Sequence, residues 1–333
     1  MGWSVSGNLS DFDRAIEDAN KLVLIGSALK TGIFSALTRE KDIDTLTREL
    51  NADKRAMYIV LEALCGMGYA EKRNEKYIIA DTARPLFIEG GDEYVGGSLP
   101  HFMNKMKAWL ELPLIIKGEK QGRKKPESIS VFMNAMASRP DAFVDKVVEG
   151  CLNRKKDAGN VLDLGGGPGK YSRAFAKRGL KAVLFDMPET IDHVGREFGL
   201  AGIRDLMLKK GDFTDDGFVN EFKGHSFDIV FMGNITHIYS EEDNRKLFLR
   251  AGKLLKPGGM VAIEDFVRGR SPSASMFAVN MLASTERGGT WTEAQYREWL
   301  IDAGFSGIEL LDVDGSEKQL ITAFLKNSKL QIK

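Results

Sequence analysis

The chain has 333 residues and a mass of 36.9 kDa, which is enough for two domains with sizeable cores. Its 47 basic and 47 acidic side chains balance, so the composition does not favour binding to nucleic acid or to an anionic membrane. No apolar run approaches the roughly 18 residues of a membrane span, and the first residues lack a secretory pattern. The two cysteines have no metal-ligand spacing. We therefore expect a cytoplasmic protein that binds no metal ion and enters no membrane.

The first hundred residues are expected to form a separate, mainly helical domain. Residues 11–37 carry closely spaced apolar side chains and predict helices, a second short helix opens at Asp44, and Asp53 caps a third. The strand patterns 69–72 and 76–79 are joined by a short polar turn and predict a hairpin. Three helices followed by a hairpin predict a winged helix.

This predicted winged helix is acidic. It carries 12 Lys and Arg against 16 Asp and Glu, a net charge of −4. In the third helix, Lys54 and Arg55 are offset by Asp53 and Glu62. DNA binding requires a basic face for phosphate contacts. We therefore expect a dimerisation module in a homodimer rather than a DNA reader, because the apolar segment at the N-terminus also needs more cover than a small domain supplies.

The rest of the chain, residues 101–333, predicts an α/β domain. Residues 101–155 look largely helical, and from residue 160 onward strand and helix patterns alternate. Such alternation predicts a Rossmann-like parallel sheet with crossover helices. The end departs from it, because 308–313 and 319–324 are strand patterns joined by a polar turn, which predicts a terminal antiparallel hairpin.

A glycine cluster follows the first of these strands. The apolar run contains Asp163, and a helical pattern begins at Lys170. A strand, a glycine turn and a helix N-terminus let the backbone approach a ligand closely. A dinucleotide fingerprint needs glycine at the sixth position from Gly165, but that position is Lys170. The pattern that remains is acid-x-G-x-G-x-G, on Asp163, Gly165, Gly167 and Gly169.

Three further strand ends carry side chains that suit a nucleoside. Asp186 ends an apolar run, where a carboxylate can accept both hydroxyls of a ribose. Asp212 can take the amino group of an adenine, and Phe213 can cover its ring. A fourth strand pattern opens onto Asn234 and His237. Each acid alone could be only a helix cap, but their order along the chain favours a nucleoside site.

Together these patterns resemble the two-domain, S-adenosylmethionine-dependent small-molecule O-methyltransferases, of the plant caffeate and vertebrate hydroxyindole type with bacterial relatives. The segments that carry the resemblance are Leu184-Phe185-Asp186-Met187-Pro188 (family F-D-L-P), Gly211-Asp212-Phe213 (G-D-M-F), Asn234 to Tyr239 (N-x-x-H-D-W), Phe132 to Met136 (F-x-x-A-M) and Ala303-Gly304-Phe305 (A-G-F). The resemblance implies S-adenosylmethionine as cofactor. The residues expected to bind it are Asp163, Gly165, Gly167, Gly169, Asp186, Met187, Asp212, Phe213 and Asn234.

The resemblance also implies a catalytic group. It places His237 at the position of the family's general base, and Glu264 where the family has a carboxylate after the next strand. Asp265 follows directly, so either acid could fix the tautomer of the imidazole. The acceptor pocket is expected to include Phe132, Met136, Met281 and Thr285, although methionine and aromatic residues at helical spacing also form ordinary cores.

The acceptor half of the family pattern is altered in this chain. Ile238 stands where an acid usually follows the histidine, Tyr239 replaces tryptophan, and Gly233 and Thr290 replace a lysine and a glutamate of the plant members. The accepting atom is therefore left open: oxygen is favoured, and carbon, nitrogen and sulfur are alternatives. Two other interpretations are a winged-helix DNA-binding regulator that senses a nucleoside, and an enzyme whose sulfonium only stabilises charge.

Overall fold

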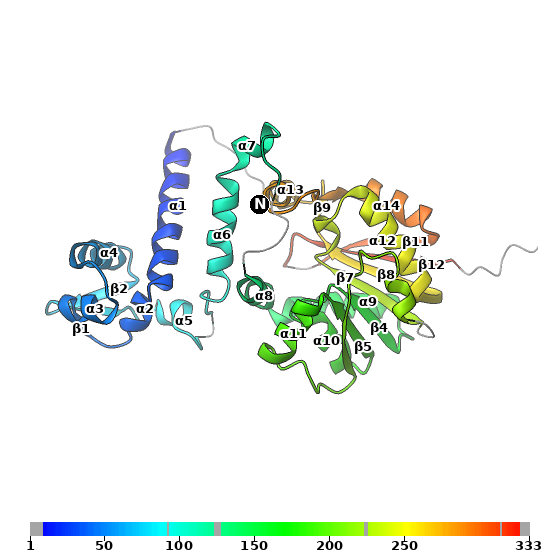
Figure 1. Ribbon diagram of the computed structural model, residues 1–333, viewed down its shortest axis with the longest axis horizontal. Helices are drawn as coiled ribbons and strands as arrows, with labels where there is room; N and C mark the ends of the chain where they lie inside the picture. Colours follow the sequence, from blue (N-terminus) through cyan, green and yellow to red (C-terminus); the bar gives the residue numbers. More distant parts are fainter. Residues whose placement is uncertain (1–8, 92, 123–127, 223–225, 314, 327–333) are drawn as a thin grey trace, which may run out of the picture. The chain divides into compact units, whose positions relative to one another are not determined.

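The computed structural model describes residues 9–91, 93–122, 128–222, 226–313 and 315–326. The chain divides into two compact units, Met1–Met106 and Lys107–Lys333. We expected the boundary at residues 100 and 101, but α6 (Leu99–Trp109) continues through that point as one helix, and the division falls near its end (Figure 1). No helix among the described residues is long and apolar enough to cross a membrane.

The first unit contains helices of 4 to 22 residues and a small antiparallel sheet of strand order β1-β3-β2. Asp53 caps α4 as expected, because its side chain accepts the Ala56 N–H at 2.7 Å. Asp42, rather than Asp44, caps α3 by accepting the Thr45 N–H at 2.8 Å. The elements are α1 (Leu9–Lys30), α2 (Ile33–Ala36), β1 (Lys41–Asp42), α3 (Ile43–Glu49), α4 (Lys54–Gly66), β2 (Ala70–Arg73), β3 (Lys76–Ile79) and α5 (Arg84–Phe87).

The second unit is built on a seven-stranded sheet of order β11-β12-β8-β7-β4-β5-β6. The strands from β4 to β8 run parallel, whereas β12 is antiparallel to β8 and β11 is antiparallel to β12. The terminal hairpin predicted from the sequence is therefore present. The strands of this unit are β4 (Asn160–Leu164), β5 (Lys181–Asp186), β6 (Leu206–Lys210), β7 (Phe227–Gly233), β8 (Leu255–Asp265), β9 (Val267–Arg268), β10 (Trp291–Thr292), β11 (Phe305–Asp312) and β12 (Gln319–Leu325).

Different helices cover the two faces of this sheet (Figure 1). Val147 of α9 and Phe175 of α10 are buried against one face, and Phe248 of α12 and Trp299 of α14 against the other. The helical elements are α7 (Leu112–Ile116), α8 (Ile129–Ala137), α9 (Asp141–Arg154), α10 (Lys170–Lys177), α11 (Pro188–Glu197), η1 (Phe218–Phe222), η2 (Thr236–Ile238), α12 (Glu241–Leu254), α13 (Pro272–Ser284) and α14 (Glu293–Asp302).

Successive residues of β8 face opposite layers. Ala262 packs with the core under α9 and α10, whereas Ile263 packs with the core under α12 and α14. Because side chains alternate along a strand, Glu264 faces the first layer and Asp265 faces the second. These two adjacent acids leave the carboxyl end of the same strand in opposite directions.

Candidate active site

The glycine turn joins β4 to α10. Gly165, Gly167 and Gly169 have φ values of 69°, 49° and 73°, a region that glycine enters at little cost. A Cβ at Gly165 would lie 2.3 Å from Cδ1 of Ile235, and one at Gly169 would lie 2.5 Å from Cδ1 of Leu200. A side chain at position 165 or 169 would therefore clash, and glycine is required there.

Asp163 lies beneath this turn and is 1% exposed. The Ser172 hydroxyl on α10 donates a hydrogen bond of 2.5 Å to its Oδ2. Burial raises the pKa of Asp163 to about 7; the Ser172 hydroxyl opposes the shift, and the nearby charge of Asp186 adds to it. Asp163 therefore links β4 to α10 inside the core.

Asp186 occupies the tip of β5, directly beside the turn. Its Oδ2 accepts the Gly167 N–H at 2.8 Å and its Oδ1 accepts the Met187 N–H at 2.7 Å. Burial raises the pKa of Asp186, and these two backbone donors oppose that shift. The Thr190 side chain is a third partner of this carboxylate. A carboxylate has about four acceptor positions, so these partners do not use all of them.

Asp212 and Phe213 follow β6. Oδ1 of Asp212 accepts both the N–H and the hydroxyl of Thr214, at 2.8 and 2.6 Å, so this acid also caps its own loop. The buried Phe213 ring meets the Tyr239 ring edge to face at 5.6 Å. Both rings line a cavity of about 330 Å³ that also includes Leu247 of α12.

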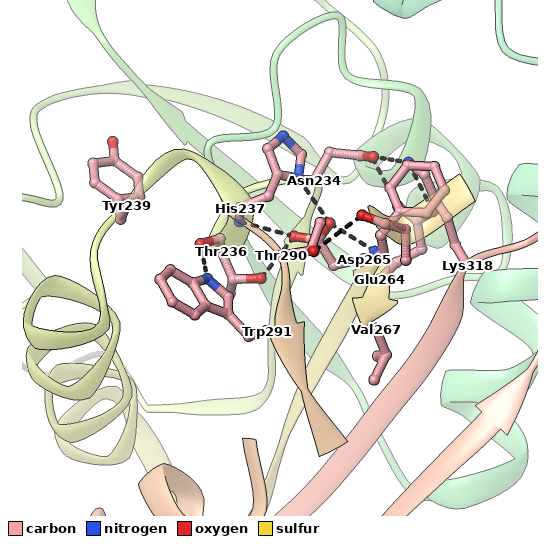
Figure 2. Close-up of polar contacts among 12 residues, drawn as sticks. Asn234, Thr236, His237, Tyr239, Glu264, Asp265, Val267, Thr290, Trp291 and Lys318 are labelled. Carbon is pink, nitrogen blue, oxygen red and sulfur yellow. Dashed lines mark hydrogen bonds and ion pairs between the residues drawn. The ribbon is translucent and has the colours of Figure 1, made fainter. Parts of the chain in front are cut away.

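His237 forms a buried pair with Asp265. Nδ1 of the imidazole lies 2.7 Å from Oδ1 of Asp265, and the side chains are 8% and 0% exposed (Figure 2). Burial acts to raise the pKa of Asp265, but the attraction and hydrogen bond of His237, with help from Lys318 and Thr236, outweigh it, so this pKa lies below its ordinary value. Among the described residues, no group hydrogen bonds with Nε2 of His237, which points away from Asp265 in Figure 2.

Glu264 belongs to a different cluster. Its Oε1 lies 2.9 Å from Arg139 Nη1 and 3.4 Å from Lys318 Nζ, and its Oε2 accepts from the Asn234 side chain at 2.7 Å. Arg139 also donates to the Tyr171 hydroxyl at 2.9 Å. Lys318 donates to Oδ1 of Asn234, and burial lowers the pKa of this lysine, which Glu264 opposes. Of the two acids that could orient His237, only Asp265 contacts it.

The residues expected to line the acceptor pocket lie on two helices. On α13, the buried Met281 is near Phe277, whose ring stands perpendicular to that of His237 at 4.8 Å. Thr285 follows α13, and its hydroxyl donates to the Met281 carbonyl at 2.7 Å. On α8, Phe132 packs against a cluster that includes Leu184 and Ile191. Met136, also on α8, is half-buried.

Four polar side chains of this site were not expected from the sequence: Arg139, Thr236, Tyr296 and Lys318. Arg139 and Lys318 are separated from Glu264 by more than fifty residues, so no local spacing links them. A hydroxyl directly before His237 was a usable signal for Thr236. Strand alternation could also have decided between Glu264 and Asp265, because only one of two adjacent acids on a strand can face the histidine.

Comparison with known proteins decides the family. Residues 119–306, more than half of the chain, match the O-methyltransferase domain family. The chain belongs to this family. It is a methyltransferase whose cofactor is S-adenosylmethionine, so the resemblance and the cofactor predicted from the motifs are confirmed.

Three curated relatives give the level of sequence similarity. The 3-hydroxy-5-methyl-1-naphthoate 3-O-methyltransferase of Streptomyces sahachiroi is 26% identical over 306 residues, 86% of this chain and 87% of the relative. The tetracenomycin polyketide synthesis 8-O-methyl transferase TcmO of Streptomyces glaucescens is 25% identical over 311 residues, 87% and 89%. The N,N-dimethyltransferase OxyT of Streptomyces rimosus is 25% identical over 265 residues, 72% and 73%.

Solved structures share the fold of this methyltransferase. An O-methyltransferase family protein from Burkholderia thailandensis aligns with a TM-score of 0.82 at 19% identity, covering 97% of this chain and 99% of the other. Human N-acetylserotonin methyltransferase in complex with S-adenosylmethionine aligns with a TM-score of 0.77 at 18% identity, covering 98% and 100%. The α/β fold with a mixed sheet is therefore that of known O-methyltransferases.

The residues of the methyltransferase sheet edge fit the cofactor. The glycine turn leaves no space for side chains at Gly165 and Gly169, so backbone N–H groups are the surface that it presents at the start of α10. The Asp186 carboxylate stands at the next strand tip with free acceptor positions. These groups would hold the amino-acid and ribose parts of S-adenosylmethionine.

Proposed function

We propose that this methyltransferase transfers a methyl group to a hydroxyl of an aromatic metabolite, with His237 as general base. The observation that carries the proposal is the buried 2.7 Å contact between His237 Nδ1 and Asp265, which leaves Nε2 without a hydrogen-bond partner among the described residues. The names of two relatives, which describe O-methylation of a naphthoate and of a tetracenomycin, support an aromatic acceptor.

The chain's own residues then have defined tasks. When bound, S-adenosylmethionine supplies an electrophilic methyl group. A phenol titrates near 10, so at neutral pH its oxygen still carries a proton when it approaches. His237 takes this proton at Nε2, because Asp265 keeps the other proton on Nδ1. The ionised Asp265 also stabilises the imidazolium that forms.

The cofactor residues divide between its parts. Asp186 accepts the ribose hydroxyls, Asp212 accepts the adenine amino group, and Phe213 covers the adenine ring. Met187 is the N-cap of α11 beside Asp186, where its half-buried side chain adds apolar contact. The side chain of Asn234 is held by Glu264 and Lys318, so its contribution is to shape the edge at a positive φ of 62°.

The acceptor lies between α13 and α8 in this proposal. Met281 and Thr285 with Phe277 form the wall nearest His237, and Phe132 and Met136 form the opposite wall. An apolar enclosure of this kind excludes water and aligns an aromatic ring with the methyl donor.

We further propose that the first unit is a winged-helix dimerisation module. Its α1 leaves Phe12, Ile16 and Val23 exposed at 65%, 47% and 43%. These positions fall on one face of the helix, and an apolar stripe of this kind needs a partner surface. The net charge of −4 in the first hundred residues disfavours DNA reading.

The test is an acceptor comparison by mass spectrometry with S-adenosylmethionine present. The arms are 2-naphthol, 2-naphthylamine and 2-methoxynaphthalene, which share one ring system and differ in the accepting group. Methylation of the naphthol with release of S-adenosylhomocysteine, and no product from the methoxy compound, is expected. A methylated amine with no methylated naphthol would instead favour N-methylation, which the name of OxyT makes the second candidate.

A further inference from the structure

Two buried hydroxyls lie behind the His237–Asp265 pair. The Thr236 hydroxyl donates to Asp265 Oδ2 at 2.6 Å, and the Tyr296 hydroxyl lies 2.6 Å from the same Thr236 oxygen. Thr236, Asp265 and Tyr296 are all 0% exposed. A hydroxyl has one proton to donate, so Thr236, which gives its proton to Asp265, accepts from Tyr296. The direction of the chain is therefore Tyr296 to Thr236 to Asp265.

The Asp265 carboxylate is fully occupied. Oδ1 meets His237 Nδ1 and accepts the Phe266 N–H at 2.8 Å, and Oδ2 accepts from Thr236 and from the His237 N–H at 3.2 Å. Four partners match the four acceptor positions of a carboxylate. Rotation of this carboxylate away from the imidazole would break the Thr236 contact, because the two carboxylate oxygens move together.

The turn that carries His237 is held by other bonds. The Asn244 side chain donates to the Thr236 carbonyl at 2.9 Å, and the Trp291 indole donates to the same carbonyl at 2.9 Å. The Gly289 N–H donates to the His237 carbonyl at 2.9 Å. The backbone of η2 is thus fixed from α12 and from the segment before α14. These bonds hold the turn without the Thr236 hydroxyl, which donates to the Asp265 carboxylate and accepts from Tyr296.

We propose that Thr236 and Tyr296 are positioning residues that hold Asp265 against His237 and so keep the proton of the imidazole on Nδ1. Their hydroxyls form a buried line that starts on α14, crosses η2 and ends at the carboxyl tip of β8 (Figure 2 shows Thr236, His237 and Asp265). The proposal rests on the proposed role of His237. It adds Thr236 and Tyr296 to the pair formed by His237 and Asp265.

The first test observes the imidazole directly and needs no acceptor. The full-length enzyme, labelled with ¹⁵N-histidine, has four histidines, and His237→Ala assigns the signals. Wild-type protein and Thr236→Ser should show His237 as a single Nδ1–H tautomer with a low-field proton. Thr236→Val and Tyr296→Phe should shift or lose that proton and mix the tautomers. An unchanged His237 signal in both variants would overturn the proposal.

Matched variants control for the loss of a buried hydroxyl as such. Thr290→Val removes a hydroxyl that is 1% exposed and donates to the Ala274 carbonyl at 3.0 Å, outside the Asp265 chain. Tyr77→Phe removes a buried tyrosine hydroxyl that donates to Glu62 at 2.6 Å in the first unit. Both should leave the His237 signal as in the wild type. A change of equal size in these controls would also count against the proposal.

The second test separates positioning from the base assignment. With 2-naphthol as acceptor, Thr236→Val and Tyr296→Phe should lower kcat by about 10–100-fold, the usual size for partners that orient an imidazole, while KM stays within a few-fold and Thr236→Ser restores kcat. If the signal of His237 changes and kcat does not, the positioning role in catalysis is wrong. If His237→Ala itself keeps full activity, the base assignment fails, and the tautomer measurement alone decides the positioning.

Discussion

At the residue scale, Asp265 and Glu264 are adjacent on β8, yet their carboxylates meet different charges. Asp265 contacts His237, and Glu264 contacts Arg139 and Lys318. Both acids are 0% exposed, so each needs its partners to remain ionised inside the protein. The pair thus divides two tasks: Asp265 contacts the proposed base, and Glu264 balances the charges of Arg139 and Lys318.

Substitution of Asp265 should mainly lower kcat, whereas substitution of Glu264 should mainly lower the free energy of unfolding. Asp265→Asn presents an amide to His237 and favours the wrong tautomer, so kcat should fall by at least about 100-fold. Glu264→Gln leaves the buried Lys318 and the half-buried Arg139 without their counter-ion, so the free energy of unfolding should fall by about 3 kcal/mol. Steady-state kinetics and denaturant titration on both variants measure the two effects. A larger loss of kcat from Glu264→Gln than from Asp265→Asn would contradict this division.

Asp186 should dominate binding of the ribose. Asp186→Ala removes charge-assisted hydrogen bonds and should weaken S-adenosylmethionine binding by about 2–3 kcal/mol. Isothermal titration calorimetry measures it, with Asp192→Ala on the following helix α11 as a control, because Asp192 forms an exposed ion pair with Lys210. Equal affinities for the parent and Asp186→Ala would refute the assignment.

Asp163 should make stability depend on pH. Its pKa is about 7 in the folded chain against about 3.9 in an unfolded one, so the folded state holds the extra proton between these values. Stability from this group is therefore full below about pH 4 and is lost as the pH rises through about 7. The free energy of unfolding of the wild type should fall relative to Asp163→Asn over that range. Parallel curves for the two proteins, measured by urea titration, would exclude this assignment.

Local sequence patterns predicted the candidate residues at the strand ends, but they did not predict which residues contact them. Asp186, Asp212 and His237 each follow a strand, and strand ends can be recognised in a sequence. The choice between Glu264 and Asp265 was left open, because it depends on which layer His237 joins. Arg139 and Lys318 were missed, because their contact with Glu264 is made only by the folded sheet edge.

At the element scale, the order of strands and helices in the second unit followed from alternation and from the glycine turn. The ends of the helices in the first unit were harder to predict from the sequence. The apolar segment 11–37 is broken after α1, because Gly32 takes a φ of 77°. The cap of α3 is Asp42 instead of Asp44, since both acids precede the same apolar pattern and only the backbone geometry distinguishes them.

The exposed stripe of α1 should drive association. Ile16→Glu places a charge among Phe12 and Val23, so the proposed dimer should dissociate at micromolar concentration. Light scattering should report about twice 36.9 kDa for the parent and about 36.9 kDa for the variant. Arg14→Glu, a charge change at a position that is 72% exposed and lies on the other side of the helix, should leave the dimer intact. A monomeric parent would contradict the dimerisation role.

At the scale of the whole molecule, the chain combines an acidic helical unit with a methyltransferase sheet. The strand tips of this sheet place the proposed cofactor residues, Asp186, Asp212 and the glycine turn, on one edge. The same edge carries Asp265 and the turn with His237 from the neighbouring strands β7 and β8. In the proposed function, cofactor binding and proton removal are therefore built on the same sheet edge, while the proposed acceptor walls come from helices α8 and α13.

The measurement that tests this account most directly is turnover of His237→Ala with 2-naphthol, together with its affinity for S-adenosylmethionine. Loss of the base should lower kcat by about 10²–10⁴-fold. Cofactor affinity should remain within a few-fold of the parent, because the residues proposed to hold the cofactor are unchanged. Turnover within a few-fold of the parent would contradict base catalysis by His237 and would leave alignment of the acceptor as the enzyme's main contribution.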